Sequence, residues 1–409
     1  MMTRDGAPVN GATERDTFQL IRRDTTTAAR LGSLRTRRGE VPTPAFMPVG
    51  TQASVKALTP EEVATTGTRI VLANTYHLML RPGPEILREA GGLHAFMRWD
   101  GPILTDSGGF QIFSLAHRRE VGEEGVVFRS HLDGSKRQLS PESVIDLQLA
   151  FGSDVTMPLD ELVGWDSSHA AQADAMRRTH RWLRRALDHF VTATDGSDNP
   201  PLLFGIAQGG FDRDRRGESA AYVASLPVDG CAVGGLSVGE PKEVMAEMLA
   251  ASVAALPAEK PRYLMGVGSP EDLWHGVAAG IDLFDCVHPT RVARRGALFS
   301  DSGRVNINNA RFRRQFEPFD PSCDCLTCRG YSAAYLHHLF RTRELLAYRL
   351  ATIHNLRFIQ RQMATIRAAL AAGNFTEAMD TFLDGYRAAD LEAAAAQRRA
   401  RRARRVSDG

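Results

Sequence analysis

Three cysteines, Cys323, Cys325 and Cys328, crowd into six residues of the sequence. Thiolates on so short a loop can converge on one cation at about 2.3 Å each, and a structural zinc ion takes four such ligands. The five cysteines are odd in number, and this cluster is too tight for a disulfide framework, so they predict a metal site in a reducing, cytoplasmic compartment. The spacing leaves three candidates open for the fourth ligand: His337, His338 and His354.

Polar residues recur where apolar, strand-sized runs stop. Asp106 follows Pro-Ile-Leu-Thr, Asp160 follows Val-Thr-Met-Pro-Leu, and Asp285 follows Ile-Asp-Leu-Phe. A single Asp at such a point is often only a helix cap. Because the same pattern returns at successive strand ends, we expect these side chains to line one pocket. Further members of the set are Gln208, Gly234, Gly235, Leu236 and Gly266.

Such a pocket suits glycosyl transfer. One carboxylate can attack a carbon as a nucleophile while another moves protons, and two Asp side chains can flank an oxocarbenium-like glycosidic carbon. A third carboxylate, an amide and main-chain groups could read the edge of a planar base. Arg291 and Arg294, shortly after Asp285, could contact phosphates. The residues therefore predict an enzyme that acts on a nucleotide or a nucleic acid.

The elements that position these residues alternate between strands and helices. Repeated β-then-α units predict a parallel sheet, with a closed (β/α)8 TIM barrel as the first choice and an open doubly wound sheet as the second. In the barrel, the carboxyl ends of all strands open onto one face, which holds the active site. The expected strands are Arg69–Ala73, Ile103–Thr105, Val155–Leu159, Leu202–Ala207, Cys231–Val233, Tyr263–Met265 and Ile281–Phe284.

Other segments interrupt this rhythm. Phe18–Arg23 and Ala29–Arg35 alternate like antiparallel strands and are expected to cap one barrel end. Val126–Leu132 and Arg137–Leu139 predict a hairpin that turns at Asp133-Gly134. A second hairpin is expected at Gly296–Phe299 and Arg304–Ile307, followed by the cysteines and then mostly helix.

The expected domain layout is simple. Residues 1–16 form a disordered polar lead, 17–400 a single catalytic barrel, and 401–409 a frayed basic tail, with the helical, zinc-binding subdomain at about 300–387.

The net charge of +2 hides an uneven distribution, since only four of the 50 basic residues are lysines. Arginine clusters occur at 291–295, 311–314 and 398–405, where they could be solvated faces or a footprint for phosphates. The longest apolar runs are strand-sized, and the N-terminus has no apolar signal region, so neither a membrane span nor secretion is expected.

These stretches resemble the bacterial tRNA-guanine transglycosylase family, also called the queuine tRNA-ribosyltransferase family. The resemblance runs from about residue 17 to about residue 387 and is carried by several specific motifs. They are Thr105–Gln111, Phe128–Gly134, Ser153–Asp154, Leu159–Glu161, Gly205–Gly210, Ala232–Glu240, Tyr263–Gly268, Phe284–Arg291 and the cysteine cluster.

The resemblance implies exchange of the wobble guanine of GUN-anticodon tRNAs (those for aspartate, asparagine, histidine and tyrosine) for 7-aminomethyl-7-deazaguanine, a queuosine precursor. Asp285 resembles the nucleophile that forms a covalent tRNA intermediate, and Asp106 resembles the general acid/base. His354 matches the fourth ligand of a structural zinc ion. A homodimer, with one subunit acting on tRNA and the other positioning it, is also implied. The base-binding residues would be Asp160, Gln208, Gly235, Leu236, Phe110, Met265 and Gly266, and the RNA contacts Arg291 and Arg294.

The sequence departs from the family pattern at a few positions. Phe110 stands where bacterial members often have Tyr, Leu162 where some have Cys, and His288 where Leu is commoner, whereas Val238 matches members that use the aminomethyl base. Queuine as the preferred base is therefore one alternative. A non-catalytic tRNA-binding partner subunit is another, although it would be expected to lack the Asp106 and Asp285 carboxylates. A hydrolytic glycosidase would need neither the zinc site nor the arginine clusters.

Overall fold

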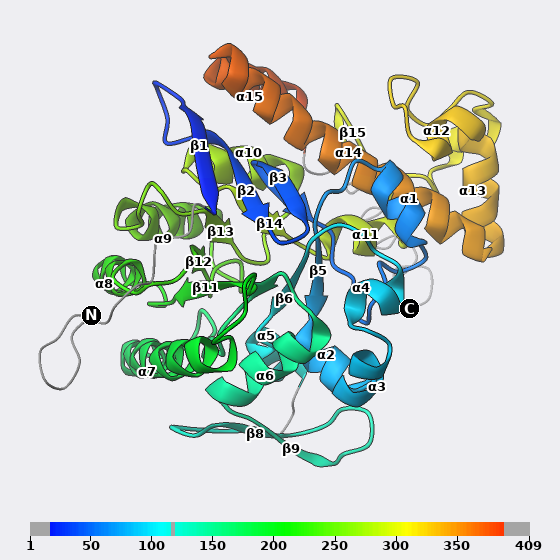
Figure 1. The fold of residues 1–409 in the computed structure, drawn as a ribbon. Helices are drawn as coiled ribbons and strands as arrows, with labels where there is room; N and C mark the ends of the chain where they lie inside the picture. Colours follow the sequence, from blue (N-terminus) through cyan, green and yellow to red (C-terminus); the bar gives the residue numbers. More distant parts are fainter. Residues whose placement is uncertain (1–16, 116–118, 388–409) are drawn as a thin grey trace, which may run out of the picture.

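A closed parallel barrel forms the centre of the computed structural model, which describes residues 17–115 and 119–387 (Figure 1). Seven parallel pairings join its strands in the order β4-β14-β13-β12-β11-β10-β6-β5. A parallel bridge between Val49 and Leu72 closes the ring, with hydrogen bonds from Gly50 N to Leu72 O (2.6 Å) and from Leu72 N to Pro48 O (3.0 Å). The strands are β4 (Ala45–Met47), β5 (Val71–Asn74), β6 (Ile103–Asp106), β10 (Val155–Thr156), β11 (Leu202–Ala207), β12 (Gly230–Val233), β13 (Arg262–Leu264) and β14 (Leu283–Asp285).

The barrel confirms the first choice of fold and rules out the open sheet. Seven of its strands overlap the expected runs, but β4 was not expected, because its three residues lie between Pro44 and Pro48 and show too little pattern. β10 is also shorter than Val155–Leu159, since its ladder ends at Thr156.

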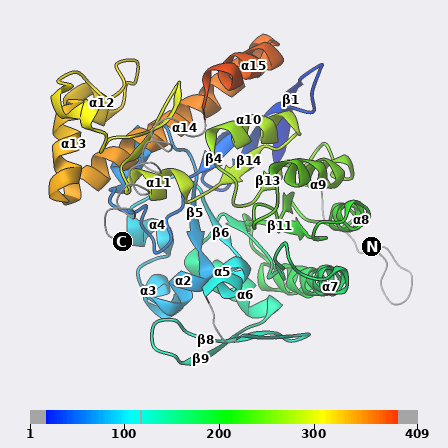
Figure 2. The ribbon, with the colours of Figure 1, turned by 180° about the vertical axis from the view of Figure 1, so that it is seen from behind.

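Helices surround the barrel in both views (Figures 1 and 2). Ser140 caps α6 by accepting a hydrogen bond from Ser143 N, and Ser269 caps α10 by accepting one from Asp272 N. These helices are α1 (Pro60–Thr65), α2 (Thr75–Leu80), α3 (Pro84–Glu89), α4 (Leu93–Met97), α5 (Gly109–Leu115), α6 (Pro141–Phe151), α7 (His169–Ala193), α8 (Arg213–Ala224), α9 (Lys242–Ala254), α10 (Pro270–Ala278) and α11 (His288–Ala293).

An antiparallel sheet of β1 (Phe18–Arg23), β2 (Arg30–Thr36) and β3 (Gly39–Thr43) covers the end of the barrel where the strands begin. Phe18 and Leu34 of this sheet share one hydrophobic cluster with the barrel-interior residues Leu104 and Leu202. The expected cap is therefore confirmed, and the opposite end, where the strands finish, is left for the site.

The predicted hairpin between α5 and α6 is a three-stranded sheet of β7 (Arg119–Gly122), β8 (Gly125–Arg129) and β9 (Lys136–Leu139). β8 ends at Arg129, which pairs with Lys136, so the prediction of a strand to Leu132 with a tight turn at Asp133-Gly134 was wrong. The wider loop is closed by hydrogen bonds from Ser130 N to Ser135 O and from Gly134 N to Ser130 O (both 2.9 Å). Asp-Gly thus turns the chain inside a longer loop.

A helical lobe stands beside the barrel (Figures 1 and 2). It has its own hydrophobic cluster, which includes Leu298, Leu336 and Leu350. The hairpin of β15 and β16 confirms the second predicted hairpin, and the long helix α14 joins the lobe to the barrel. The elements are β15 (Ala297–Ser300), β16 (Gly303–Asn306), the 3-10 helix η1 (Ala310–Arg314), α12 (Leu326–Gly330), α13 (Ala333–Thr342), α14 (Leu345–Ala372) and α15 (Phe375–Gly385).

Two expectations, the disordered lead at 1–16 and the basic tail at 401–409 with its arginine cluster, lie outside the described residues. Among the described residues, no helix combines the length and the apolar character needed to cross a membrane.

Candidate active site and metal centre

Asp106 is the last residue of β6 and is 8% exposed. Its Oδ1 accepts a hydrogen bond from Thr75 N (3.0 Å), and its Oδ2 accepts from Asn74 Nδ2 (2.6 Å) and Gln111 Nε2 (2.8 Å). Burial raises the pKa of Asp106 to about 6, against these hydrogen bonds, and the nearby charge of Asp285 adds to the rise. A carboxyl group with this pKa can both donate and accept a proton near neutral pH.

Asp285 is the last residue of β14 and is 9% exposed. Its Oδ1 accepts hydrogen bonds from the Tyr263 hydroxyl (2.5 Å) and from Gly266 N (2.7 Å). Its Oδ2 accepts none from the residues that the structure describes. Burial raises the pKa of Asp285, and the same two hydrogen bonds oppose that rise. One oxygen is therefore anchored, and the other is available to a substrate.

Asp160 and Gln208 come from neighbouring strand ends and bind each other. Gln208 Nε2 donates to Asp160 Oδ2 (2.8 Å), while Ser107 Oγ donates to Asp160 Oδ1 (2.8 Å). Both residues are buried, and burial raises the pKa of Asp160. Together they present carboxylate and amide oxygens that could accept hydrogen bonds from a ligand.

Gly235 and Leu236 follow β12 and are buried. Within the described part of the chain, the N–H groups of these two residues donate to no acceptor, whereas the preceding Gly234 N donates to Ala207 O (3.0 Å). A Cβ at Gly235, whose φ is +68°, would lie 2.3 Å from Gln208 Oε1. The backbone therefore lies directly against the Gln208 amide and offers two hydrogen-bond donors beside it.

The remaining predicted residues lie at the same end of the barrel. Phe110, in the first turn of α5, is 51% exposed. Met265 packs partly against the barrel-interior cluster, and its neighbour Gly266 is exposed. On α11, Arg291 is exposed, and just after that helix Arg294 Nη1 donates to Thr290 O (2.8 Å).

The metal ligands expected from the sequence come together. Ligand atoms of Cys323, Cys325, Cys328 and His354 all lie within 4.8 Å of one another, and all four residues are buried. His354 Nδ1 lies 3.7 Å from Cys325 Sγ and 3.3 Å from Cys328 Sγ. Tetrahedral zinc bonds place such sulfur and nitrogen atoms roughly 3.6 Å apart, so this donor set fits the ion.

His354 is also oriented from behind, since its Nε2 lies 2.7 Å from Phe299 O. A proton on Nε2 that is donated to this carbonyl leaves Nδ1 free to bind a metal, as is usual for metal-binding histidines. His337 is engaged elsewhere, because its Nδ1 lies 2.8 Å from Ile307 O. Of the three histidines left open by spacing, the structure brings His354 to the cysteines.

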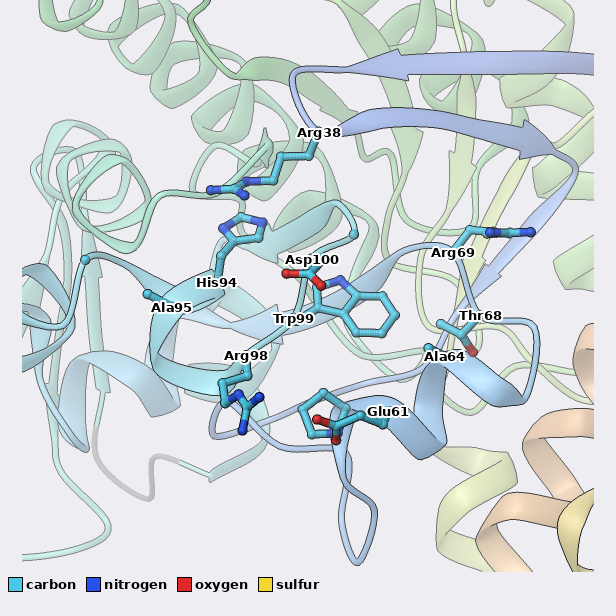
Figure 3. A pocket seen from close by; sticks show the side chains of 13 residues that line it. Arg38, Glu61, Ala64, Thr68, Arg69, His94, Ala95, Arg98, Trp99 and Asp100 are labelled. Atoms are coloured by element: carbon cyan, nitrogen blue, oxygen red, sulfur yellow. The ribbon is translucent and has the colours of Figure 1, made fainter.

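A pocket of about 610 Å³ lies away from these carboxylates, near the starts of β5 and β6 (Figure 3). Trp99, Arg98 and Arg38 are among its lining residues. His94, also in its wall, binds the buried Asp154 (2.9 Å), which is a structural contact. At this end of a TIM barrel, such contacts serve stability.

Sequence reasoning missed the partners that hold the carboxylates. Gln111 lies within a quoted motif, and Asn74 and Thr75 follow an apolar run as the predicted polar residues do, so these three were within reach of pattern analysis. Tyr263 also lies within a quoted motif, but as a residue of an apolar strand it gave no sign of its partner, and only the fold brings its hydroxyl to Asp285.

The fold and the site define a TIM-barrel protein with buried carboxylates at one barrel end and a lobe whose cysteine-histidine cluster could bind a metal ion. A sequence profile of the family described as queuine tRNA-ribosyltransferase matches residues 24–388. The chain belongs to this family of tRNA-modifying pentosyltransferases.

Individual relatives agree with the family match. The chain is 54% identical over 369 residues to the queuine tRNA-ribosyltransferase of Pelotomaculum thermopropionicum, covering 90% of this chain and 98% of that protein. It is 50% identical over 375 residues to the protein of the same name from Dictyoglomus turgidum, covering 92% and 96% of the two chains.

Proposed function

We propose that this enzyme exchanges guanine at the wobble position of GUN-anticodon tRNAs for 7-aminomethyl-7-deazaguanine through a covalent intermediate on Asp285. One observation carries the proposal: the nearby charge of Asp285 raises the pKa of the buried Asp106 at the same barrel end, yet of the two carboxylates only Asp285 has an oxygen that accepts no hydrogen bond from the described residues. Asp106 has both oxygens occupied by donors that fix its position. This asymmetry suits a nucleophile and a proton carrier.

In the first half-reaction, Asp285 Oδ2 attacks C1′ of the ribose, and the C1′–N9 bond to guanine breaks. Asp106 in its protonated form gives its proton to the departing base. In the second half-reaction, the Asp106 carboxylate takes the N9 proton of the incoming base, which attacks C1′ and releases Asp285. Both steps pass through an oxocarbenium-like carbon between two carboxyl groups.

The base would be read by Asp160, Gln208 and the main chain at Gly235, Leu236 and Gly266. Phe110 and Met265 would lie on the two faces of the ring, and stacking does not require the hydroxyl that Phe110 lacks. Arg291 and Arg294 would contact the anticodon loop. Leu162 and Val238 bear on the choice between the aminomethyl base and queuine, which is the alternative substrate.

The cluster of Cys323, Cys325, Cys328 and His354 would hold one zinc ion. With four protein ligands the ion has no open position, so its role is structural and no step of the reaction uses it. We further propose that the enzyme works in the cytoplasm as a homodimer.

The metal assignment is tested with His354→Ala and His337→Ala. We expect metal analysis to find one zinc per subunit in the wild type and in His337→Ala, and loss of zinc and of thermal stability in His354→Ala. Unchanged zinc content in His354→Ala would refute the ligand set.

The reaction is tested by incubating the enzyme with unmodified tRNA and labelled guanine. We expect label to enter the tRNA and a protein–RNA adduct to survive denaturation. Asp285→Ala should abolish both, because the nucleophile is gone, whereas Asp301→Asn, an exposed carboxylate between β15 and β16, should retain both. Normal guanine exchange by Asp285→Ala would contradict the proposed mechanism. Binding of tRNA without exchange by the wild type would favour a non-catalytic partner subunit, and release of base without exchange a hydrolase.

A further inference from the structure

Arg216, in the first turns of α8, is 0% exposed and makes three hydrogen bonds to main-chain carbonyls. Its Nε donates to Gly210 O (2.7 Å), Nη1 to Gly234 O (2.7 Å) and Nη2 to Gly235 O (3.2 Å). These carbonyls belong to the loops that follow β11 and β12. One side chain therefore ties together the two loops that adjoin Gln208.

Burying this guanidinium is costly. Burial lowers the pKa of Arg216 to about 9, and the charge of Glu240 only partly offsets the effect. Within the described residues, its hydrogen bonds go to carbonyls and none to a carboxylate. A buried cation without a hydrogen-bonded anion is a poor way to gain stability, so its geometry points to a different use.

The geometry fixes the direction of two donors. In a trans peptide, the C=O of one residue and the N–H of the next point in opposite directions. Because Arg216 binds the Gly234 and Gly235 carbonyls, the N–H groups of Gly235 and Leu236 point away from it. These are the two buried donors without an acceptor among the described residues.

Neighbouring side chains leave the loops little freedom to adjust. A Cβ at Gly234 would lie 2.7 Å from Gln208 Nε2, and one at Gly210 would lie 2.2 Å from Gln172 Oε1. Gln172 Oε1 in turn accepts a hydrogen bond from Phe211 N (3.0 Å). Glycine at these positions lets the backbone approach the amides, and Arg216 holds it there from the other side.

We propose that Arg216 is a positioning residue that sets the base specificity of the candidate pocket by aiming the N–H groups of Gly235 and Leu236 at a carbonyl oxygen of the base. This inference rests on the proposed function. Two donors beside the Asp160 carboxylate complement an edge with a carbonyl next to N–H groups, as in guanine. They oppose an edge whose carbonyl is replaced by an amino group, as in 2,6-diaminopurine.

The test compares Arg216→Lys with Arg262→Lys. Arg262 is also a buried arginine that donates hydrogen bonds to main-chain carbonyls, from Nη2 to Leu256 O (2.8 Å) and from Nε to Pro257 O (3.2 Å). It lies where β13 begins, at the other end of the barrel. Lysine keeps the charge and cannot hold three carbonyls in a planar fork. Both variants should lose thermal stability.

Only Arg216→Lys should raise KM for guanine, by about tenfold or more, and reduce the preference for guanine over 2,6-diaminopurine as a competitor. Its affinity for tRNA should stay within about twofold of the wild type, since no RNA contact is altered. An unchanged KM in Arg216→Lys, or equal changes in both variants, would overturn the inference. If the lysine variant does not fold, Arg216→Gln, which loses the charge, takes its place, and the same change in KM for guanine is expected.

A measurement on the unaltered protein does not depend on how the variants fold. Guanine should slow amide hydrogen exchange at Gly235 and Leu236, and unchanged exchange there would contradict the proposed donors. A wild type that incorporates no guanine would instead overturn the proposed function and this inference with it. If the wild type incorporates guanine normally and Arg216→Lys has an unchanged KM for guanine, only this inference is overturned.

Discussion

The two ends of the barrel both bury carboxylates, but they surround them with different partners. Where the strands begin, Asp282 forms an ion pair with the buried Arg30, and Asp154 binds Arg37 (2.9 Å) and His94 (2.9 Å). Where the strands finish, Asp106 and Asp285 accept hydrogen bonds from amides, main-chain N–H groups and a tyrosine hydroxyl, all neutral donors.

The pKa values of Asp154 and Asp106 show the effect of this difference, whereas burial raises the pKa of Asp282 even against its ion pair with Arg30. Burial acts to raise the pKa of Asp154, but hydrogen bonds from His94, Ile103 and Arg37 outweigh it and lower the pKa. At the other end, burial prevails and raises the pKa of Asp106 to about 6. A cation at the barrel end where the strands finish would favour the charged form of Asp106 or Asp285. It would thereby weaken that carboxylate as a nucleophile or base. Neutral donors hold it in place and leave its proton affinity high.

The largest effect on stability is expected at the barrel end where the strands begin, which the sheet of β1–β3 covers. Asp282→Asn leaves Arg30 buried without its partner charge, which should cost about 3–5 kcal/mol of unfolding free energy. Exchange activity per folded molecule should be nearly unchanged, because the site lies at the other end. Urea denaturation and the guanine exchange assay measure the two quantities. A loss of less than about 1 kcal/mol would show that the ion pair does not dominate this end.

At the barrel end where the strands finish, we expect a substitution to increase the free energy of unfolding. The folded-state pKa of Asp106 lies above the unfolded value, so the folded state binds the extra proton, and stability falls as pH rises from about 4 through 6. Asp106→Asn mimics the protonated form. Relative to the wild type it should gain up to about 3 kcal/mol above pH 7, and nothing below pH 4. Unfolding curves at pH 4 and pH 8 measure this, and a pH-independent difference would contradict the raised pKa.

Asp154 should show the reverse pH dependence with a smaller effect. Its folded-state pKa is lowered, so its contribution is present above the unfolded value of about 3.8 and is lost as pH falls through the folded value. Asp154→Asn should cost about 1–3 kcal/mol at pH 7, and less as the pH approaches 3. The same unfolding curves provide the measurement. A cost that grows toward acid pH would reverse the comparison between the two ends.

The sequence predicted those parts of the molecule that local pattern encodes. The cysteine cluster and the alternation of strands and helices are visible within short windows, and the structure confirms the four-residue cluster and the barrel. The carboxylates at strand ends are also local signals, and the structure places Asp106 and Asp285 at the last residues of their strands. The choice of His354 came from the family resemblance, because spacing alone could not distinguish three histidines on two helices.

The parts that were missed depend on contacts between distant segments. β4 is three residues long and is a strand because β14 pairs with it. Arg216 lay among other basic residues of an exposed-looking helix, and nothing local distinguishes it from Arg215 or Arg213. Its role follows only when two loops fold over it. The Asp133-Gly134 turn was misplaced because its loop closes through Ser130 and Ser135.

Helix α14 spans 28 residues and contributes to both halves of the molecule. It carries His354 of the cysteine-histidine cluster. Six residues further on, Gln360 Nε2 donates to Phe46 O (3.0 Å) of β4, and Arg367 Nη1 donates to Pro44 O (2.6 Å). The three-residue strand β4 is thus supported by the helix that carries one member of the cysteine-histidine cluster. Lobe and barrel should consequently melt in a single cooperative transition, and removal of the metal would loosen the seam at which the barrel closes.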